Sequence, residues 1–113
     1  MLFRSVFQYH MKTKEMEILP PLKVARSSFA AHYDFGDRFI YIIGGADSSG
    51  QMIQNCEKFD IFNQVWHPMP SLKHSRGNPG TFMSNDKRYL YAFQGFVNRN
   101  DDHPGENALG QRN

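Results

Sequence analysis

Two segments of the 113-residue chain have residue types and spacings that resemble sites of phosphate chemistry. Asp34-Phe35-Gly36 has the order of the metal-binding tripeptide of protein kinases, but a kinase also needs a glycine-rich phosphate loop, a catalytic-loop aspartate and a far longer chain. Gly44 to Gly50 is rich in glycine, yet Gln51 stands where a phosphate-binding loop needs Lys followed by Ser or Thr. We therefore interpret the first segment as a turn and the second as a loop between strands.

The histidines, the acidic tail and the single cysteine give little support for metal or thiol chemistry. The histidines show neither the i, i+4 pairing of a helix nor cysteine partners at zinc-ligand spacing; they are His10, His32, His67, His74 and His103. Asp101-Asp102-His103 carries ligating groups, but a flexible polar tail seldom preorganises a site. Cys56 is the only cysteine, so no disulfide can form within the chain. The sequence predicts no cofactor and no metal.

Composition and charge predict a small domain that works in the cytoplasm. The net charge is +2, and the thirteen Lys and Arg are spread along the chain, whereas a nucleic-acid binder gathers them into a patch. Residues 1–7 lack the apolar core of a signal peptide, and no apolar run reaches the roughly 18 residues of a membrane helix. We expect no binding to nucleic acid or membrane.

A repeat with a period of 50 residues underlies the sequence. Shifting the chain by 50 aligns identical residues, and seven of these pairs cluster where strands or their ends are expected. The pairs are Pro20/Pro70, Leu22/Leu72, Lys23/Lys73, Arg26/Arg76, Arg38/Arg88, Tyr41/Tyr91 and Gly45/Gly95. Conservative matches align Tyr9 with Phe59, Phe39 with Tyr89, Ile40 with Leu90 and Ile43 with Phe93. Self-similarity at a fixed period predicts an array of similar units.

The central unit is predicted to contain four short strands. They are expected at residues 28–33, 39–43, 56–61 and 65–67. Phe39 to Ile43 is apolar on both faces, which favours a strand covered on both sides. Asn63-Gln64 is expected to form the last turn, and Pro68 and Pro70 to end the fourth strand. Residues 98–113 are polar with almost no apolar side chains, which predicts a disordered tail.

Together these residues resemble the Kelch motif of β-propeller proteins. The family pattern is an Arg, a strand that ends in Gly-Gly, a Glu-x-Tyr/Phe-Asp segment and a Trp about six residues later. All parts are present in order, at Arg26, Gly44, Gly45, Glu57, Phe59, Asp60 and Trp66. The flanking units are partial: His10 replaces the Asp, Met16 replaces the Trp and Gln94 replaces the first Gly.

The resemblance covers Val6 to Phe96 and implies an all-β fold of four-stranded antiparallel blades. The chain would hold about two blades' worth of an incomplete propeller in residues 1–97, followed by the tail at 98–113. The expected division is the second half of a blade at 1–25, a full blade at 26–75 and the first half of a blade at 76–97.

Simple physical roles account for the residues of this motif. Gly44 and Gly45 allow close approach of backbone or a positive φ. Trp66 and Tyr41 offer large apolar faces for the wedge between adjacent blades. A guanidinium can satisfy several carbonyls at once, which is the expected role of the arginines that begin each unit. Alternatively, these arginines contact a ligand in a groove on the loop face.

By this resemblance the chain is expected to be a protein-interaction scaffold and not an enzyme, because propeller loops mainly bind proteins or peptides. The candidate contact residues are Arg26, Asp47, Ser48, Gln51, Lys73, His74 and Arg76. One alternative is a structural module that self-assembles through open blade edges and has no dedicated ligand. A remote alternative is a fragment of a Kelch-like copper radical oxidase, although Cys56 falls in an outer strand, away from a central copper.

Overall fold

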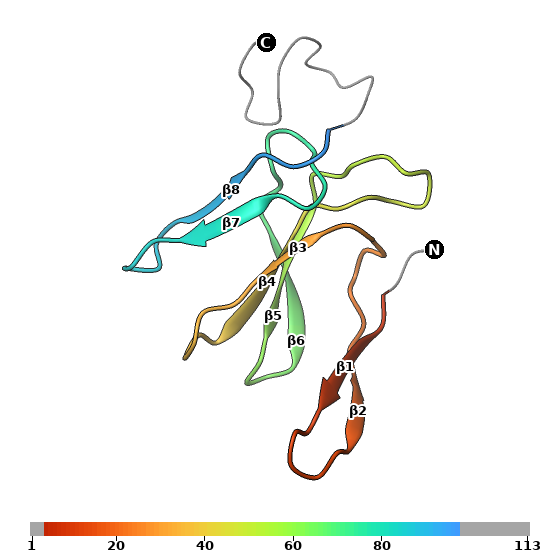
Figure 1. Ribbon diagram of the computed structural model, residues 1–113, viewed down its shortest axis with the longest axis vertical. Coiled ribbons are helices and arrows are strands. Elements are labelled where there is room, and N and C mark those ends of the chain that lie inside the picture. Colours follow the sequence, from red (N-terminus) through yellow and green to blue (C-terminus); the bar gives the residue numbers. More distant parts are fainter. Residues whose placement is uncertain (1–3, 98–113) are drawn as a thin grey trace.

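The computed structural model describes residues 4–97, which form eight β-strands in three antiparallel sheets (Figure 1). The strands are β1 (Val6–Tyr9), β2 (Met16–Leu19), β3 (Ala30–His32), β4 (Phe39–Ile43), β5 (Cys56–Asp60), β6 (Val65–Met69), β7 (Gly80–Met83) and β8 (Leu90–Phe93). No helix that could cross a membrane occurs within residues 4–97. The expected disordered tail at 98–113, with Asp101, Asp102 and His103, lies outside the described residues.

The central sheet is a four-stranded blade in the order β3-β4-β5-β6. β4 pairs with β5 from Phe39↔Asp60 to Ile43↔Cys56, and β5 pairs with β6 from Asp60↔Val65 to Cys56↔Met69. The all-β architecture predicted from the sequence is thus confirmed, and β4 has the predicted bounds. Asp34-Phe35-Gly36 forms the predicted turn, in which the Asp37 amide donates to the Asp34 carbonyl oxygen at 2.9 Å.

Two strand boundaries predicted from the sequence are wrong by two residues, and β3 and β5 each end one residue earlier than predicted. β3 begins at Ala30 and not at Ser28, because Ser28 adopts a left-handed conformation with φ of 50°. Pro68 does not end the fourth strand but lies within it, opposite Glu57. β6 is the outermost strand of the blade, and proline is tolerated at an edge because its missing N–H breaks no interior ladder.

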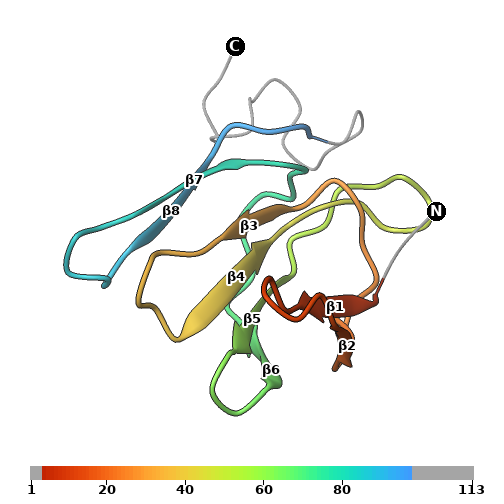
Figure 2. The ribbon, with the colours of Figure 1, turned by 60° about the horizontal axis from the view of Figure 1, so that its bottom comes forward.

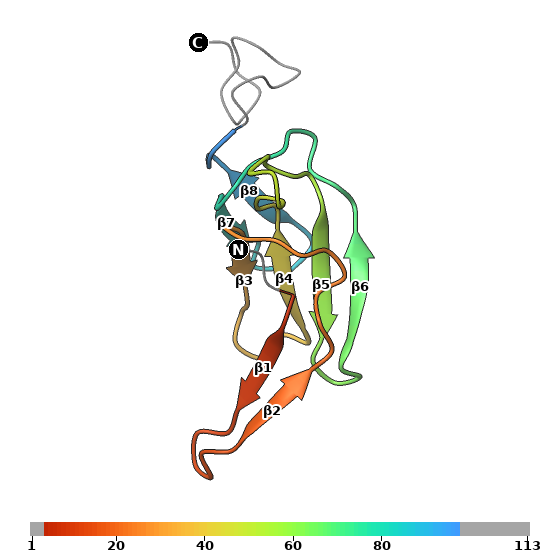
Figure 3. The same cartoon turned by 90° about the vertical axis from the view of Figure 1, so that its right-hand side faces the viewer.

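Two half-blades flank the central sheet, β1-β2 on one side and β7-β8 on the other (Figures 1 and 3). Their pairing repeats that of the central blade at a distance of 50 residues. Tyr9 pairs with Met16 as Phe59 pairs with Trp66, and Gly80 pairs with Phe93 as Ala30 pairs with Ile43. β1 and β2 therefore correspond to β5 and β6, and β7 and β8 correspond to β3 and β4.

The replacement of Asp by His in the first unit preserves the turn that follows it. In the central blade, Asp60 Oδ1 accepts hydrogen bonds from the amides of Phe62 and Asn63, at 3.0 and 3.2 Å. In the first unit, His10 Nδ1 accepts from the amides of Lys12 and Thr13, at 3.3 and 3.2 Å. The imidazole nitrogen of His10 thus accepts the same pair of amide hydrogen bonds as the carboxylate oxygen of Asp60 at the same place in the repeat.

Each face of the central sheet is covered by one of the half-blades. The side chains of β4 contact both half-blades, because successive side chains of a strand point to opposite faces of the sheet. On one face Ile42 belongs to a buried cluster with Leu19, Leu22, Phe59 and Trp66. On the other face Ile43, Ala30 and Cys56 form a second cluster, against which Leu90 and Ala92 of β8 pack. The prediction that Phe39–Ile43 is covered on both sides is confirmed.

Hydrogen bonds also join the three units. Trp66 Nε1 donates to the carbonyl oxygen of Pro20 at 2.8 Å, which connects β6 with the segment after β2. On the opposite side β7 lies next to β3 (Figure 2). Between these strands, His32 Nδ1 is 3.1 Å from Thr81 Oγ1. The Asn78 amide donates to the Ser28 carbonyl oxygen at 2.6 Å. Neighbouring units therefore share both apolar side chains and polar contacts.

Candidate partner-binding surface

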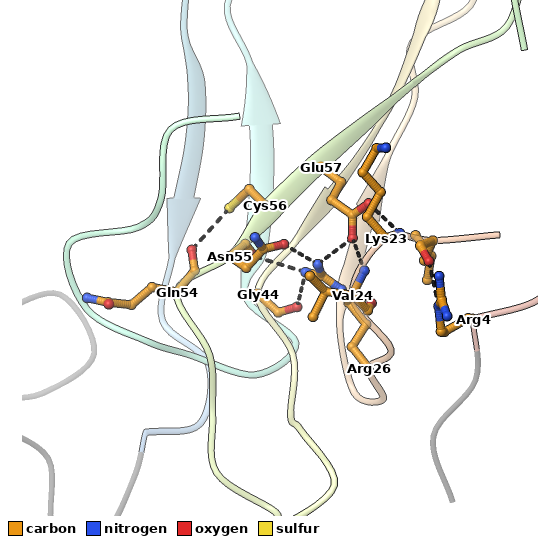
Figure 4. A network of polar contacts seen from close by, with 10 residues as sticks. Arg4, Lys23, Val24, Arg26, Gly44, Gln54, Asn55, Cys56 and Glu57 are labelled. Atoms are coloured by element: carbon orange, nitrogen blue, oxygen red, sulfur yellow. Dashed lines mark hydrogen bonds and ion pairs between the residues drawn. The ribbon is translucent and has the colours of Figure 1, made fainter. Parts of the chain in front are cut away.

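Arg26 lies at the centre of a buried polar network at the base of the loop that connects β4 with β5 (Figure 4). Nη1 donates to the carbonyl oxygens of Gly44 and Asn55, at 2.9 and 2.8 Å. Nη2 donates to Asn55 Oδ1 and to Glu57 Oε2, the latter at 2.7 Å. The side chain has no exposed surface. Burial lowers the pKa of the guanidinium, and this effect is larger than the attraction of Glu57, which raises the pKa.

Glu57 extends this network to the segment that enters the blade. Its two carboxylate oxygens accept the backbone amides of Lys23 and Val24, at 2.8 and 3.1 Å. Glu57 is 1% exposed and forms an ion pair with Arg26 at 2.7 Å. A buried charge of this kind is stable only when paired and hydrogen-bonded, which both groups are. The network thus holds residues 23–26, 44 and 55–57 in one arrangement.

Arg76 occupies the equivalent position in the next unit and has fewer hydrogen-bond partners than Arg26 among residues 4–97. Its guanidinium donates to the carbonyl oxygens of His74 and Ala92, at 3.4 and 3.3 Å. It is 6% exposed, and burial lowers its pKa. The Arg76 carbonyl oxygen accepts the Gly45 amide at 3.0 Å. A Cβ on Gly44 would collide with that same oxygen, so the close approach requires glycine.

The loop from Ala46 to Met52 is held by hydrogen bonds of Asp47. Its Oδ1 accepts from Ser49 Oγ at 2.7 Å and from the amides of Ser49 and Gln51, at 2.9 and 3.1 Å. These bonds, with that of the Ser49 hydroxyl the largest, lower the pKa of the Asp47 carboxyl. Ser48 and Gln51 are exposed on this ordered loop.

A second loop lies at the same end of the blade. β4 ends, β5 begins and β6 ends at this rim, because the three strands are antiparallel neighbours. Gln54 Nε2 donates to the Lys73 carbonyl oxygen at 2.8 Å, which ties the loop after β6 to the segment before β5. The Lys73 side chain is left exposed. In Figure 1 both loops lie toward the top of the molecule.

The structure places all seven candidate contact residues at this one rim, but their side chains differ in exposure to solvent. Ser48, Gln51 and Lys73 are exposed and Asp47 is half-buried. Arg26, His74 and Arg76 are buried, so their side chains reach solvent little or not at all. We therefore retain partner contact as a prediction for the first four residues, and we describe the two arginines by the carbonyl oxygens that they bind.

Sequence reasoning missed a second cluster at the opposite rim, where Arg38 is the central residue. Its guanidinium lies 5.6 Å from the ring centroid of Phe39 and 5.3 Å from that of Phe62, and it forms a two-point bond with Asp60 at 3.0 and 2.8 Å. Lys58 Nζ lies 4.4 Å from the Phe39 centroid. The match of Arg38 with Arg88 across the repeat was the available signal.

The Arg38–Asp60 pair predicts a measurable pH dependence. The hydrogen bond from Arg38, supported by the amides of Asn63 and Phe62, holds the pKa of Asp60 well below its usual range. A depressed folded-state pKa stabilises the fold above the unfolded-state value of about 4, and this stabilisation is lost as the pH falls below it. Between pH 5 and pH 3, we expect the Tm of the wild type to fall more steeply than that of Asp60→Asn. Parallel slopes in thermal melts followed by circular dichroism would contradict this.

Within residues 4–97 no three His, Cys, Asp or Glu side chains lie close enough together to hold a metal ion. Cys56 is buried in β5, and burial raises the pKa of its thiol. Its Sγ is 3.6 Å from the Gln54 carbonyl oxygen (Figure 4). The described rims carry hydrogen-bonding and charged groups on loops held by hydrogen bonds.

Comparison with known proteins identifies two similar sequences, both with kelch repeats in their names. A RING finger domain and kelch repeat-containing protein of Dictyostelium discoideum is 36% identical over 74 residues, which are 66% of this chain and 7% of that protein. A putative F-box/kelch-repeat protein of Arabidopsis thaliana is 38% identical over 69 residues, or 60% of this chain and 17% of that protein. The chain therefore spans a small part of either relative. No protein-family model matches it.

Proposed function

Since the chain belongs to the Kelch-repeat family, we propose that it is part of a β-propeller scaffold that binds a protein or peptide. The observation that carries the proposal is the rim formed by the loops at 46–52 and 70–79. Both loops are fixed by hydrogen bonds, and both leave polar side chains exposed. Preorganised loops bind with a smaller loss of conformational entropy than flexible ones.

The proposal assigns different roles to the loop residues of the rim and to the buried polar network beneath them. Asp47, Ser48, Gln51 and Lys73 contact the partner, while the Arg26–Glu57 network keeps the loops in position from below. The segments 1–25, 26–75 and 76–97 act as half, full and half blades of the propeller. We further propose action in the cytoplasm, which suits a buried and unpaired Cys56.

A peptide selection tests the binding rim directly. Random peptides displayed on phage are selected on the immobilised 113-residue chain, and the affinity of each enriched peptide is measured by isothermal titration calorimetry. We expect Lys73→Glu and Gln51→Ala to weaken binding at least about tenfold, or about 1.4 kcal/mol. Both side chains are exposed, so the substitutions leave the core intact.

Lys12→Glu is the matched control, because Lys12 is exposed in the turn between β1 and β2 at the opposite rim. It makes the same change of charge as Lys73→Glu and should leave affinity unchanged. Equal affinities for all three variants would exclude the rim as the contact surface. Failure to enrich any peptide would argue against a binding role.

A second function, self-assembly, is supported by a different observation. Within the described residues β1 pairs only with β2, and β8 only with β7, so each half-blade has an open edge. Open edges present unpaired backbone groups and favour pairing with another chain. On this proposal the chain is a structural module whose partner is a second copy of itself.

A further inference from the structure

The two open edges of the chain are complementary, because they belong to different halves of the same blade. β7 and β8 correspond to the first two strands of the central blade, and β1 and β2 to its last two. Within residues 4–97, β7-β8 is thus the half of a blade that a β1-β2 pair would complete. This complementarity develops the proposed self-assembly and is independent of the proposed binding rim.

The equivalence also fixes the register of the missing contact. In the central blade β4 and β5 pair through Ile40↔Phe59, Tyr41↔Lys58, Ile42↔Glu57 and Ile43↔Cys56. We propose that β8 of one copy pairs with β1 of a second copy in the register of the β4-β5 pair. The residue numbers of β4 are raised by 50 and those of β5 are lowered by 50. This pairing completes a four-stranded blade in the order β7-β8-β1-β2. The expected antiparallel pairs are Leu90↔Tyr9, Tyr91↔Gln8, Ala92↔Phe7 and Phe93↔Val6.

An apolar cavity next to β1 supports this register. The cavity has a volume of about 470 Å³ and lies between the β1-β2 hairpin and the central sheet, lined mainly by apolar side chains that include Val6, Phe29, Ile40, Ile42 and Trp66. Val6 holds the place of Cys56, whose cross-strand partner is Ile43. The residue at the place of Ile43 in the second copy is Phe93, so its side chain would stand beside Val6 and enter the cavity.

Phe93 has the size and exposure that this role requires. It is 41% exposed in the single chain, and its ring lies 2.7 Å from the point where a Cβ on Gly80 would be. The pair Ala30 and Ile43 of the central blade is thus replaced by a smaller and a larger residue, Gly80 and Phe93. A cavity of about 150 Å³ accommodates a benzene molecule, so a phenylalanine ring fits well within the larger one here.

The joined blade differs from the central blade at the position of Glu57, and substitution at that position can test the proposed contact. Phe7 occupies the position of Glu57, so β1 brings no carboxylate to the buried Arg76 of the other copy. The contact would rest on the backbone ladder and on aromatic side chains that are exposed in the single chain. These are Phe7, Tyr9, Tyr91 and Phe93.

Repetition of this head-to-tail contact gives a closed ring when the rotation between copies closes. Residues 4–97 of each copy supply eight strands, or two blades' worth, so a ring built from these strands alone contains an even number of blades. Propellers have typically 4–8 blades, which corresponds to about two to four copies. We therefore expect a discrete oligomer of the 113-residue chain.

Disulfide trapping between single-cysteine variants tests the register. In a Cys56→Ala background, Gln8→Cys is mixed with Tyr91→Cys under mild oxidation, so that a mixed disulfide can only form between copies. Residues directly opposite in an antiparallel sheet lie about 4.5–5.5 Å apart between Cα atoms, within the range of a disulfide. We expect a cross-linked dimer for this mixture, and light scattering of the wild type should show a mass of two to four chains.

Ala92→Cys mixed with Gln8→Cys is the matched control, because neighbouring positions of a strand point to opposite faces. It should cross-link at least about tenfold more slowly than the Tyr91→Cys mixture. Equal rates for both mixtures would overturn the register. A monodisperse, folded monomer with no cross-link in either mixture would overturn the association itself.

A pair of glutamate variants gives a second test, which requires no cysteine. Phe7→Glu restores the carboxylate opposite Arg76 and should associate at least as tightly as the wild type, by sedimentation equilibrium. Tyr9→Glu introduces the same charge on the same face of β1, at the place of the buried Phe59, and should weaken association at least about tenfold. Equal weakening by both variants would exclude the proposed pairing of Arg76 with position 7.

Discussion

Replacing Glu57 with Ala is expected to destabilise the fold by about 3–5 kcal/mol, the cost of removing one partner from a buried ion pair. Arg26 would keep its charge with no exposed surface and without the carboxylate at 2.7 Å. The amides of Lys23 and Val24 would lose their acceptor as well. Urea melts followed by circular dichroism measure the change in the free energy of unfolding.

Glu17→Ala is the matched control, because Glu17 is exposed on β2. Exposed substitutions of this kind change stability by about 0.5 kcal/mol or less. Replacing the pair together, with Arg26→Met and Glu57→Leu, should recover part of the loss, since no uncompensated charge stays buried. A loss below about 1 kcal/mol for Glu57→Ala would contradict the central role of the network.

Trp66→Ala is expected to have an effect of similar size, about 3–5 kcal/mol, as for a large aromatic side chain lost from a packed site. Trp66 is 6% exposed, and its ring centroid lies 4.9 Å from that of Phe59. The substitution also removes the hydrogen bond from Nε1 to the Pro20 carbonyl oxygen. It should therefore release the β1-β2 hairpin as well as loosen the central sheet.

His67→Ala provides the comparison one residue along the same strand. His67 is exposed on β6, opposite Lys58, and its side chain points to the other face of the sheet. The expected loss is about 0.5 kcal/mol or less. Equal losses for the two variants, measured in the same urea melts, would mean that the packing of this strand is different from that described here.

The strands could be predicted from the sequence wherever apolar residues face both sides of the sheet. Phe39–Ile43 has no polar interruption, and its bounds were right. The ends of β3 and β6 were misjudged because they depend on conformations that residue type does not determine. Ser28 has a positive φ although it is not glycine, and Pro68 continues an edge strand in which its missing donor is tolerated.

The location of the candidate residues at one rim could be predicted from the sequence, but the exposure of their side chains could not. A loop position in a repeat follows from the period, and all seven residues do lie at one rim. Whether an arginine faces a partner or a carbonyl oxygen depends on residues far along the chain, such as Asn55 and Glu57 around Arg26. The cluster around Arg38 was missed for the same reason, since Phe62 and Asp60 approach it only through the β5-β6 turn.

The position of Trp66 has a practical consequence for spectroscopy. It is the only tryptophan of the chain, and its indole lies where the β1-β2 hairpin meets the central sheet. Intrinsic fluorescence excited at the indole band therefore reports the environment of that junction alone, while circular dichroism averages over all eight strands. A fluorescence change that precedes the loss of strand signal during unfolding would record the undocking of the hairpin as a separate kinetic event.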